Sequence, residues 1–187
     1  MKIIYDKADV NDITELTRFR LDYLEEDIGG VKEDERDIIE ERLPVYYKEH
    51  LNKDFHVFVA RDEDKADIVG CCFLLVTEKP ANPNFISGLT GTVLNVYVKP
   101  EYRRRGIAKR MMEELISFAK ESGLDNVELK STDSGYELYR SLGFEDEVSK
   151  YHRMKIVLTQ SEKSPTSKLR CRWGLCQTIL SRGTSSD

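Results

Sequence analysis

The order of hydrophobic and polar positions predicts that the chain begins with one short strand and two helices. Lys2–Tyr5 is the strand candidate. Over about Asp9–Glu25, apolar residues recur at steps of three and four, which is the period of a helix with one buried face. A second helix is expected over about Asp34–His50, with a kink at Pro44 because proline has no backbone N–H to donate. A glycine pair between these segments separates the two helices.

Three β-rich runs and a long helix are predicted next. The runs Phe55–Ala60, Ile68–Val76 and Gly91–Val98 are rich in β-branched and aromatic residues, which favours strands. Residues 104–122 predict the most regular helix of the chain, because their apolar side chains form one stripe. Gly123 is expected to end this helix.

The last predicted elements are short. Val127–Lys130 is a strand candidate, and Ser134–Leu142 is predicted as a helix whose first residue forms a capping box with Glu137. Phe144–Leu158 predicts one or two closing strands. Strands and helices therefore alternate irregularly, which indicates an α/β (α+β) domain that ends near residue 158.

Charge is distributed unevenly over the 187 residues. The net charge of −5 combines 24 basic and 32 acidic residues in positions 1–158 with 5 basic and 2 acidic residues in positions 159–187. The second stretch also contains 10 Ser or Thr residues without a helix or strand period. We interpret residues 159–187 as a Ser/Thr-rich basic tail that is either disordered or not native to the protein.

Composition excludes several classes of protein. No run of about 18 apolar residues predicts a membrane span, and charges interrupt the first residues, where a secretion signal needs an apolar stretch. Cys71 and Cys72 are expected on opposite faces of one strand, and no His follows Cys171 or Cys176. Neither a metal site nor a disulfide framework is predicted. A soluble, cytoplasmic protein is expected.

The segment with the most informative chemistry joins the strand at Gly91–Val98 to the long helix. Residues 99–109 read KPEYRRRGIAK. The first N–H groups of a helix have no partner within it and carry the positive end of its dipole. A phosphate binds there when the backbone allows close approach, and the small residues Gly106 and Ala108 allow it. The segment therefore predicts a pyrophosphate site. A basic patch for nucleic acid is the alternative, which the acidic balance of residues 1–158 disfavours.

This segment resembles the acetyl-CoA signature of the GNAT N-acetyltransferase superfamily. The signature R/Q-x-x-G-x-G/A is matched by Arg103, Gly106 and Ala108. Its usual lead-in, an apolar strand followed by Pro-x-Tyr, is matched by residues 96–102. A downstream element Tyr-x-x-x-Gly-Phe is matched from Tyr139. The resemblance covers about residues 1–158 in element order and is most specific over residues 91–145.

The resemblance implies a fold and a cofactor. Six to seven strands would form a mixed, mostly antiparallel sheet flanked by about four helices. The fourth and fifth strands, which hold Val96 and Val127, would splay apart, and acetyl-CoA would lie in the opening.

The resemblance also implies which residues bind acetyl-CoA. The backbone of residues 96–98 would pair with the pantetheine arm, and the amides of residues 104–109 would cradle the pyrophosphate. The family often has Asn and Ala where this chain has Thr132 and Gly135, so Thr132 and Ser134 are expected to replace that polar contact. The complete expected set is Val96, Tyr97, Val98, Arg103, Arg104, Arg105, Gly106, Ile107, Ala108, Lys109, Thr132 and Ser134.

Tyr139 matches the family's general acid, which protonates the leaving CoA thiolate. A phenol of pKa near 10 can donate to a thiolate of comparable basicity; the alternative role is packing of a short helix on the sheet. For the base that deprotonates the amine, Glu78, His56 and Asp133 are all candidates, and none stands out. Cys71 and Cys72 are poor nucleophile candidates, so direct transfer without an acyl-enzyme is expected.

In this family the acceptor site is built largely from the first two helices and their connection. Here that connection is crowded with carboxylates, which favours a cationic amine, although a solvated charged loop explains them equally well. These residues are Glu25, Glu26, Asp27, Glu33, Asp34, Glu35 and Asp37.

The resemblance thus implies an acyltransferase that moves an acetyl group from acetyl-CoA to a primary amine of a small molecule or peptide. The alternative is a non-catalytic acyl-CoA-binding or partner-binding module on the same fold. A homodimer is left open, and neither a membrane nor a nucleic acid is expected as a partner.

Overall fold

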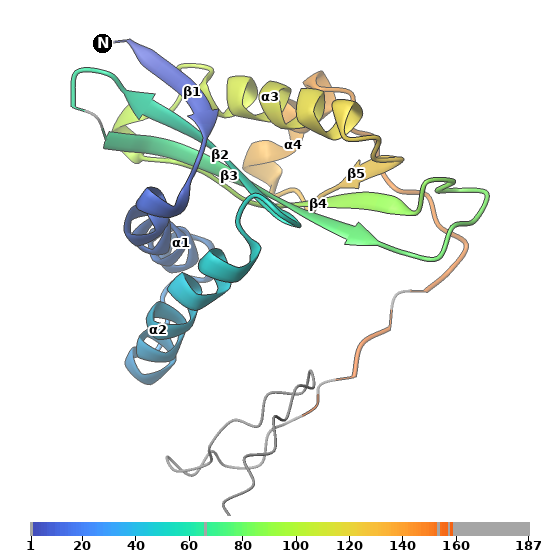
Figure 1. Ribbon diagram of the computed structural model, residues 1–187, viewed down its shortest axis with the longest axis horizontal. Coiled ribbons are helices and arrows are strands. Elements are labelled where there is room, and N and C mark those ends of the chain that lie inside the picture. The colour runs from blue at the N-terminus through green and yellow to red at the C-terminus, as the bar shows by residue number, and fades with distance from the viewer. Residues whose placement is uncertain (1, 66, 153, 157, 159–187) are drawn as a thin grey trace, which may run out of the picture. The chain divides into compact units, whose positions relative to one another are not determined.

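The computed structural model describes residues 2–65, 67–152, 154–156 and 158 (Figure 1). Residues Met1–Asp146 form one compact unit. Its strands are β1 Ile3–Lys7, β2 Phe55–Asp62, β3 Asp67–Glu78, β4 Leu89–Val98 and β5 Asn126–Glu128. Its α-helices are α1 Ile13–Ile28, α2 Glu33–His50, α3 Ile107–Glu121 and α4 Asp133–Ser141. The 3-10 helices η1 Val10–Asp12 and η2 Pro100–Tyr102 precede α1 and α3. The predicted tail at 159–187 lies outside the described residues.

The five strands form one sheet in the order β1-β2-β3-β4-β5. The first four are antiparallel to their neighbours, and β5 runs parallel to β4, which confirms a mixed, mostly antiparallel sheet. β5 pairs with β4 only over Thr90–Thr92. Within the described residues, positions 93–98 of β4 therefore have no strand partner on that side. The sheet is thus open along the second half of β4.

The predicted number of strands, six to seven, is not confirmed. The described residues contain five strands, and those between 144 and 158 form none. Val148, Met154 and Ile156 are 98%, 94% and 81% exposed. A strand is stable where a neighbour accepts its hydrogen bonds and a core covers one of its faces. The apolar residues of this segment therefore predicted a strand, but the described structure gives it neither a neighbouring strand nor a core to cover one face.

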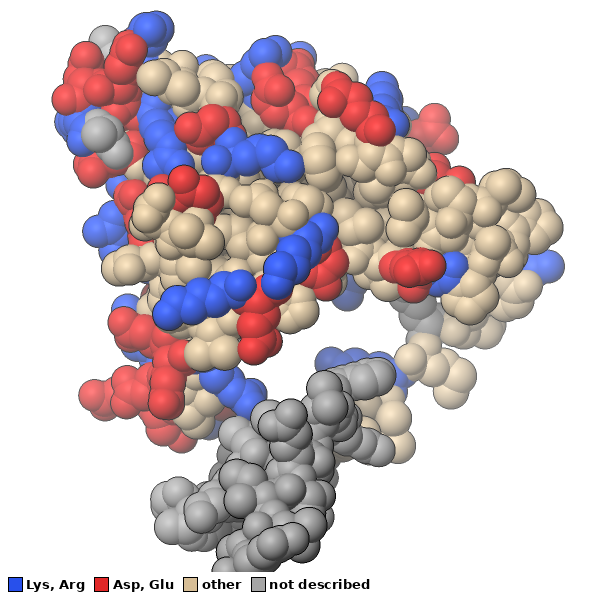
Figure 2. Space-filling view, in the orientation of Figure 1, with Lys and Arg blue, Asp and Glu red and all other residues tan. Residues whose placement is uncertain are grey.

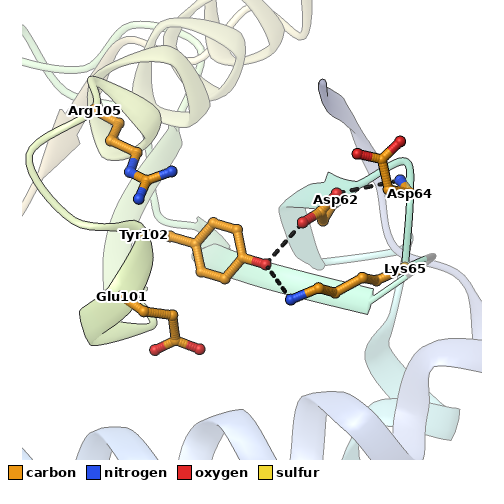
Figure 3. A pocket seen from close by; sticks show the side chains of 6 residues that line it. All are labelled: Asp62, Asp64, Lys65, Glu101, Tyr102 and Arg105. Carbon is orange, nitrogen blue, oxygen red and sulfur yellow. Dashed lines mark hydrogen bonds between the residues drawn. The ribbon is translucent and has the colours of Figure 1, made fainter. Parts of the chain in front are cut away.

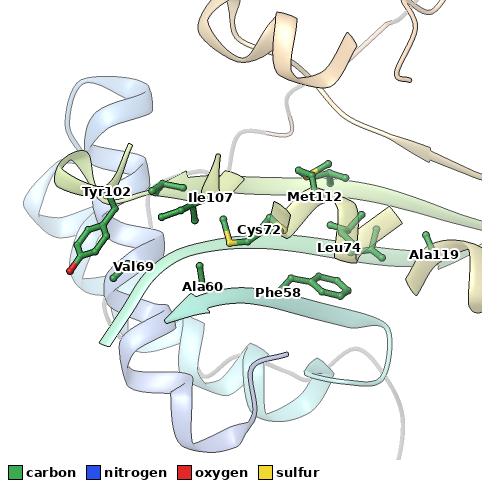
Figure 4. Packing of buried hydrophobic residues seen from close by; sticks show 13 residues of the cluster. Phe58, Ala60, Val69, Cys72, Leu74, Tyr102, Ile107, Met112 and Ala119 are labelled. Atoms are coloured by element: carbon green, nitrogen blue, oxygen red, sulfur yellow. The ribbon is translucent and has the colours of Figure 1, made fainter. Parts of the chain in front are cut away.

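The sheet separates two hydrophobic clusters. On one face, α3 packs Met111, Met112 and Leu115 against β2, β3 and β4 (Figure 4). On the other face, residues of α1 and α2 pack against the same strands. Cys72 belongs to the first cluster and Cys71 to the second, which confirms their predicted placement on opposite faces. Both faces of the central strands are covered, so burial along β2 and most of β3 is continuous rather than alternating.

Three helix starts differ from the prediction. α1 begins at Ile13, after the 3-10 helix η1, rather than near Asp9. α3 begins at Ile107 rather than near residue 104, because Arg104 and Gly106 adopt φ angles of +61° and +78°, outside the right-handed helical region. α4 begins at Asp133 with Thr132 as its N-cap, and no side-chain cap bond forms. The predicted capping box of Ser134 and Glu137 is therefore wrong. Within the described residues, no helix is both long and apolar enough to cross a bilayer.

Tyr47 leads to a prediction about stability. Its side chain is 1% exposed, and its hydroxyl has no hydrogen-bond partner among the described residues. Burying an unpaired hydroxyl costs about 1–3 kcal/mol. Tyr47→Phe is therefore expected to raise the free energy of unfolding by about 1 kcal/mol, measured by urea denaturation. Tyr46→Phe is the matched control, since Tyr46 is only half-buried. A loss of stability in Tyr47→Phe would show that the hydroxyl is satisfied.

Candidate active site

The open half of β4 contains a β-bulge. Cys71 of β3 lies opposite Tyr97, and Phe73 lies opposite Leu94, so Asn95 and the residue after it together oppose Cys72. Asn95 adopts a φ of +53° and is 5% exposed. This bulge is not among the features predicted from the sequence. The one available signal was the residue type, because Asn adopts positive φ several times more often than most residues.

The three residues predicted to line the pantetheine arm point to different faces of the sheet. Val96 and Val98 pack against the cluster under α3. Tyr97 packs on the opposite face, where its ring lies edge-on to Phe19 at 5.9 Å and to Tyr23 at 6.4 Å. Tyr97 thereby links β4 to α1. The side chains therefore lie on the two faces of the sheet, and only the backbone of residues 96–98 lies along the open edge of β4.

The predicted pyrophosphate site lies in the loop before α3 and the first turn of that helix. Arg110 donates its N–H to the carbonyl of Gly106 at 3.0 Å, which closes the first turn of α3. The preceding N–H groups of Ile107, Ala108 and Lys109 have no acceptor within the helix. A Cβ at Gly106 would meet no atom within 4 Å, so open space lies next to this backbone. An anion with several oxygen atoms fits such a position.

The Arg103 side chain is bonded to two other elements. Its Nε donates to the carbonyl of Val98 at 2.8 Å, and its Nη2 donates to Glu26 of α1 at 2.6 Å. The hydrogen bond from Arg103 holds the pKa of Glu26 below its usual value. The guanidinium therefore ties the start of the loop to β4 and α1. The contact of Arg103 with acetyl-CoA stays a prediction.

Tyr102 anchors the loop from beneath. Its hydroxyl donates to Asp62 at 2.7 Å and accepts from Lys65 at 3.3 Å (Figure 3). Tyr102 and Asp62 are both buried, and the bond from Tyr102 lowers the pKa of the Asp62 carboxyl. Arg105 lies over the Tyr102 ring at 5.7 Å. A pocket on this side of the loop is lined by Asp62, Asp64, Lys65, Glu101, Tyr102 and Arg105.

Tyr139 projects from α4 toward the same hydrophobic cluster that Val96 and Ala108 contact. Its ring lies edge-on to Phe144 at 6.0 Å. Burial raises the pKa of Tyr139 to about 12, with smaller contributions from Cys72 and Tyr23. A Cβ at Gly135 would lie 2.9 Å from the Tyr139 ring, so the glycine leaves room for the ring to fold back along its own helix. The phenol is thus kept protonated at neutral pH.

A family model for the acetyltransferase (GNAT) domain matches residues 53–146, from just before β2 to just after α4. The chain belongs to the GNAT acetyltransferase family. The match includes the open edge of β4, the loop and Tyr139, whereas α1 and α2 precede it. No curated protein sequence matches the chain.

Solved structures support the GNAT fold. The chain is similar to a predicted acetyltransferase from Clostridium acetobutylicum, solved with acetyl-CoA, at 25% identity and a TM-score of 0.71, over 82% of this chain and 96% of that one. A GCN5-related N-acetyltransferase from Ralstonia eutropha JMP134 is 20% identical with a TM-score of 0.68, over 82% and 99% of the chains. Glucosamine-6-phosphate N-acetyltransferase from Arabidopsis thaliana is 16% identical with a TM-score of 0.62, over 82% and 99%. At 20% and 16% identity, the last two show the fold alone.

Thr132 and Ser134, which are expected to make a polar contact with acetyl-CoA, lie at the N-terminus of α4. The hydroxyls of Thr132 and Ser134 are 3.1 Å apart and hydrogen-bonded to each other, and both residues are exposed. Their oxygens are therefore accessible to a ligand at the start of α4. In the described part of the chain, no group of three or more His, Cys, Asp or Glu side chains gathers in a way that could hold a metal ion.

The candidates for the GNAT general base are far apart. Glu78 lies at the end of β3 opposite Leu89, which is seven residues from Val96 and hence about 20 Å away along the strand. His56 is 7% exposed, packs against Phe118, and has a pKa lowered by burial and by Lys7. Neither position suits a base for an amine at the open edge of β4. Asp133 is exposed in the first turn of α4.

The acidic connection between α1 and α2 is partly neutralised. Glu25 forms an ion pair with Arg36 at 2.6 Å, and Glu26 forms one with Arg103 at 2.6 Å. Asp27 is hydrogen-bonded to Tyr23, whose pKa is raised mainly by burial and also by that carboxylate. Acidic side chains remain at the surface near the start of α2, in the lower left of Figure 2, where Glu33, Asp34 and Glu35 form the first turn.

Proposed function

We propose that this protein is an N-acetyltransferase that moves the acetyl group of acetyl-CoA directly to a primary amine of a small molecule or peptide. One observation carries the proposal: the open, bulged half of β4 ends at the loop that exposes the first N–H groups of α3. Tyr139 packs against the same hydrophobic cluster as Val96. Bound acetyl-CoA supplies an acetyl group activated as a thioester.

The chain's own residues fit that ligand in three places. The backbone of residues 96–98 offers the hydrogen-bonding groups of an unpaired strand edge to the amides of the pantetheine arm. The N–H groups of residues 104–109 face the pyrophosphate, with Gly106 leaving the space that a Cβ would fill. Thr132 and Ser134 offer hydroxyls from the start of α4.

Two groups act on the acetyl thioester. The N–H of Val96, at the bulge, donates to the acetyl oxygen as negative charge develops there. Tyr139 holds the proton that the departing thiolate takes. Burial raises the pKa of the Cys71 thiol to about 12 and that of Cys72 well above its usual value, so neither is available as a thiolate nucleophile. This supports direct attack by the amine.

The acceptor is proposed to carry positive charge. The carboxylates at the surface between α1 and α2 attract cations and repel anions, even after Arg36 and Arg103 have paired with two of them. The attraction is expected to be screened as ionic strength rises.

The proposal is tested by the release of free thiol from acetyl-CoA in the presence of a panel of amines. The panel contains diamines and polyamines, aminoglycosides, amino sugar phosphates, and peptides with a free N-terminus or Lys side chain. Turnover with a cationic amine is expected. Acetyl-CoA binding without turnover of any amine or peptide would favour the non-catalytic binding module instead.

The raised pKa of Tyr139 predicts the alkaline side of the pH profile. A general acid acts in its protonated form, so its activity is lost as the pH rises through its pKa. Because that pKa is about 12, kcat/KM is expected not to fall between pH 7 and about 10. A tyrosine of ordinary pKa would already be half ionised at pH 10. A measured fall in kcat/KM with an apparent pKa below 10, in wild type but not in Tyr139→Phe, would contradict this assignment.

A further inference from the structure

A buried polar cluster lies beneath the bulge of β4, on the face that α1 covers. Arg20 of α1 donates through Nη1 to the side-chain oxygen of Asn95 at 3.0 Å. The Asn95 amide nitrogen in turn donates to the sulfur of Cys71 at 3.5 Å. Asn95 and Cys71 are 5% and 0% exposed. The carboxamide therefore has a partner at both ends, and one of them is a charged group from another element.

The backbone of Asn95 needs such support. Its φ of +53° lies in the left-handed region, which strains a non-glycine residue and persists where the surrounding structure holds it. The two side-chain bonds hold the carboxamide in one orientation while the backbone takes this angle. The φ of Asn95 also sets the direction of the peptide group that follows it, and that peptide carries the N–H of Val96.

Arg20 is itself held firmly in position. The neighbouring Phe19 is fully buried and packs edge-on against Tyr97 at 5.9 Å. The guanidinium of Arg20 also lies over the Tyr23 ring at 5.4 Å. The packing of α1 on β4 thus fixes the position of the guanidinium, and the guanidinium is bonded to Asn95 in the bulge.

We propose that Arg20 is a positioning residue for acetyl transfer, because it fixes, through Asn95, the bulge peptide whose N–H receives the acetyl oxygen. The inference rests on the proposed function. It assigns to α1, which precedes the region matched by the family model, a direct part in the geometry of the thioester site. Arg20 itself is proposed to contact neither the acetyl thioester nor the attacking amine.

The test compares four variants with wild type. Arg20→Met keeps the length of the side chain but cannot donate, whereas Arg20→Lys retains a donor. Arg18→Met is the matched control, because Arg18 is an exposed arginine on the same helix whose bond goes to Glu15 at 3.1 Å. Asn95→Gly removes the carboxamide but tolerates the φ angle, so it tests the same link if Arg20→Met does not fold.

Two readouts are measured with each variant. The first is kcat and the KM for acetyl-CoA with an amine that wild type acetylates. The second is the ratio of the dissociation constants of CoA and acetyl-CoA, measured by calorimetry without any amine. Loss of an oxyanion donor costs on the order of 100-fold in kcat, so misdirecting it is expected to lower kcat roughly 10-fold in Arg20→Met. KM is expected to stay within about twofold, and the preference for acetyl-CoA over CoA is expected to disappear.

Partial recovery of kcat in Arg20→Lys and wild-type behaviour of Arg18→Met complete the expected pattern. A fall in melting temperature in Arg20→Met with unchanged kcat and an unchanged affinity ratio would overturn the proposal, because a merely structural role gives that result. If wild type acetylates no amine, the proposed function fails. The affinity ratio still decides whether Arg20 positions the bulge toward the acetyl group.

Discussion

Tyr139→Phe is expected to lower kcat by about 100-fold, because general acid catalysis typically contributes 10²–10⁴-fold. The phenol packs against the same hydrophobic cluster as Val96, and its pKa of about 12 keeps it protonated at neutral pH. Phe occupies the same space beside Phe144, so the fold and the dissociation constant of acetyl-CoA are expected to change little. The measurements are steady-state kinetics and calorimetry with acetyl-CoA.

Tyr136→Phe provides the matched control for this result. Tyr136 lies on the same helix, is 38% exposed, and donates to Asp146 at 2.8 Å. Its loss is expected to leave kcat within about twofold of wild type. An unchanged kcat in Tyr139→Phe would sink the assignment of Tyr139 as the acid and leave it a packing residue.

Gly106→Ala is expected to raise the dissociation constant of acetyl-CoA by at least about tenfold. The added Cβ would enter the open space next to the first N–H groups of α3, where close approach of a phosphate needs a bare backbone. The φ of +78° also strains any residue with a Cβ by about 1 kcal/mol. The dissociation constant is measured by calorimetry, and stability by thermal denaturation.

Gly123→Ala separates strain from ligand contact. Gly123 lies just beyond the other end of α3, has a φ of +72°, and has equally open surroundings. Both variants are therefore expected to lose similar stability, and only Gly106→Ala is expected to lose affinity. Equal affinities in the two variants would show that acetyl-CoA does not approach the backbone at Gly106.

Local patterns were sufficient to predict most of the elements. The apolar stripe of residues 104–122 predicted α3, and the β-rich runs predicted β2, β3 and β4. These signals are local, because a helix and a buried strand each impose a period on the residues that face the core. The closing strands predicted at 144–158 are not formed by the described residues. A strand also depends on a neighbouring strand, which its own residues do not specify.

The candidate site was predictable to a similar extent. The segment at 99–109 and the element from Tyr139 can be identified from residue types and spacing alone. Neither the bulge at Asn95 nor the bond from Arg20 to it was predictable, because these residues are 75 positions apart and pair only once α1 packs on β4. The bond of Arg103 to Glu26 joins residues 77 positions apart in the same way.

The sequence by itself determined the order of most elements, the prediction of a phosphate site in the loop before α3, and the family resemblance, because each depends on neighbours within a few residues. Only the tertiary structure decided which side chains are already engaged within the protein. It made Arg103, whose contact with acetyl-CoA stays a prediction, a link between the loop and α1, and it raised the pKa of Tyr139 through burial. Burial and long-range pairing are properties of the packed sheet and helices, and no local pattern contains them.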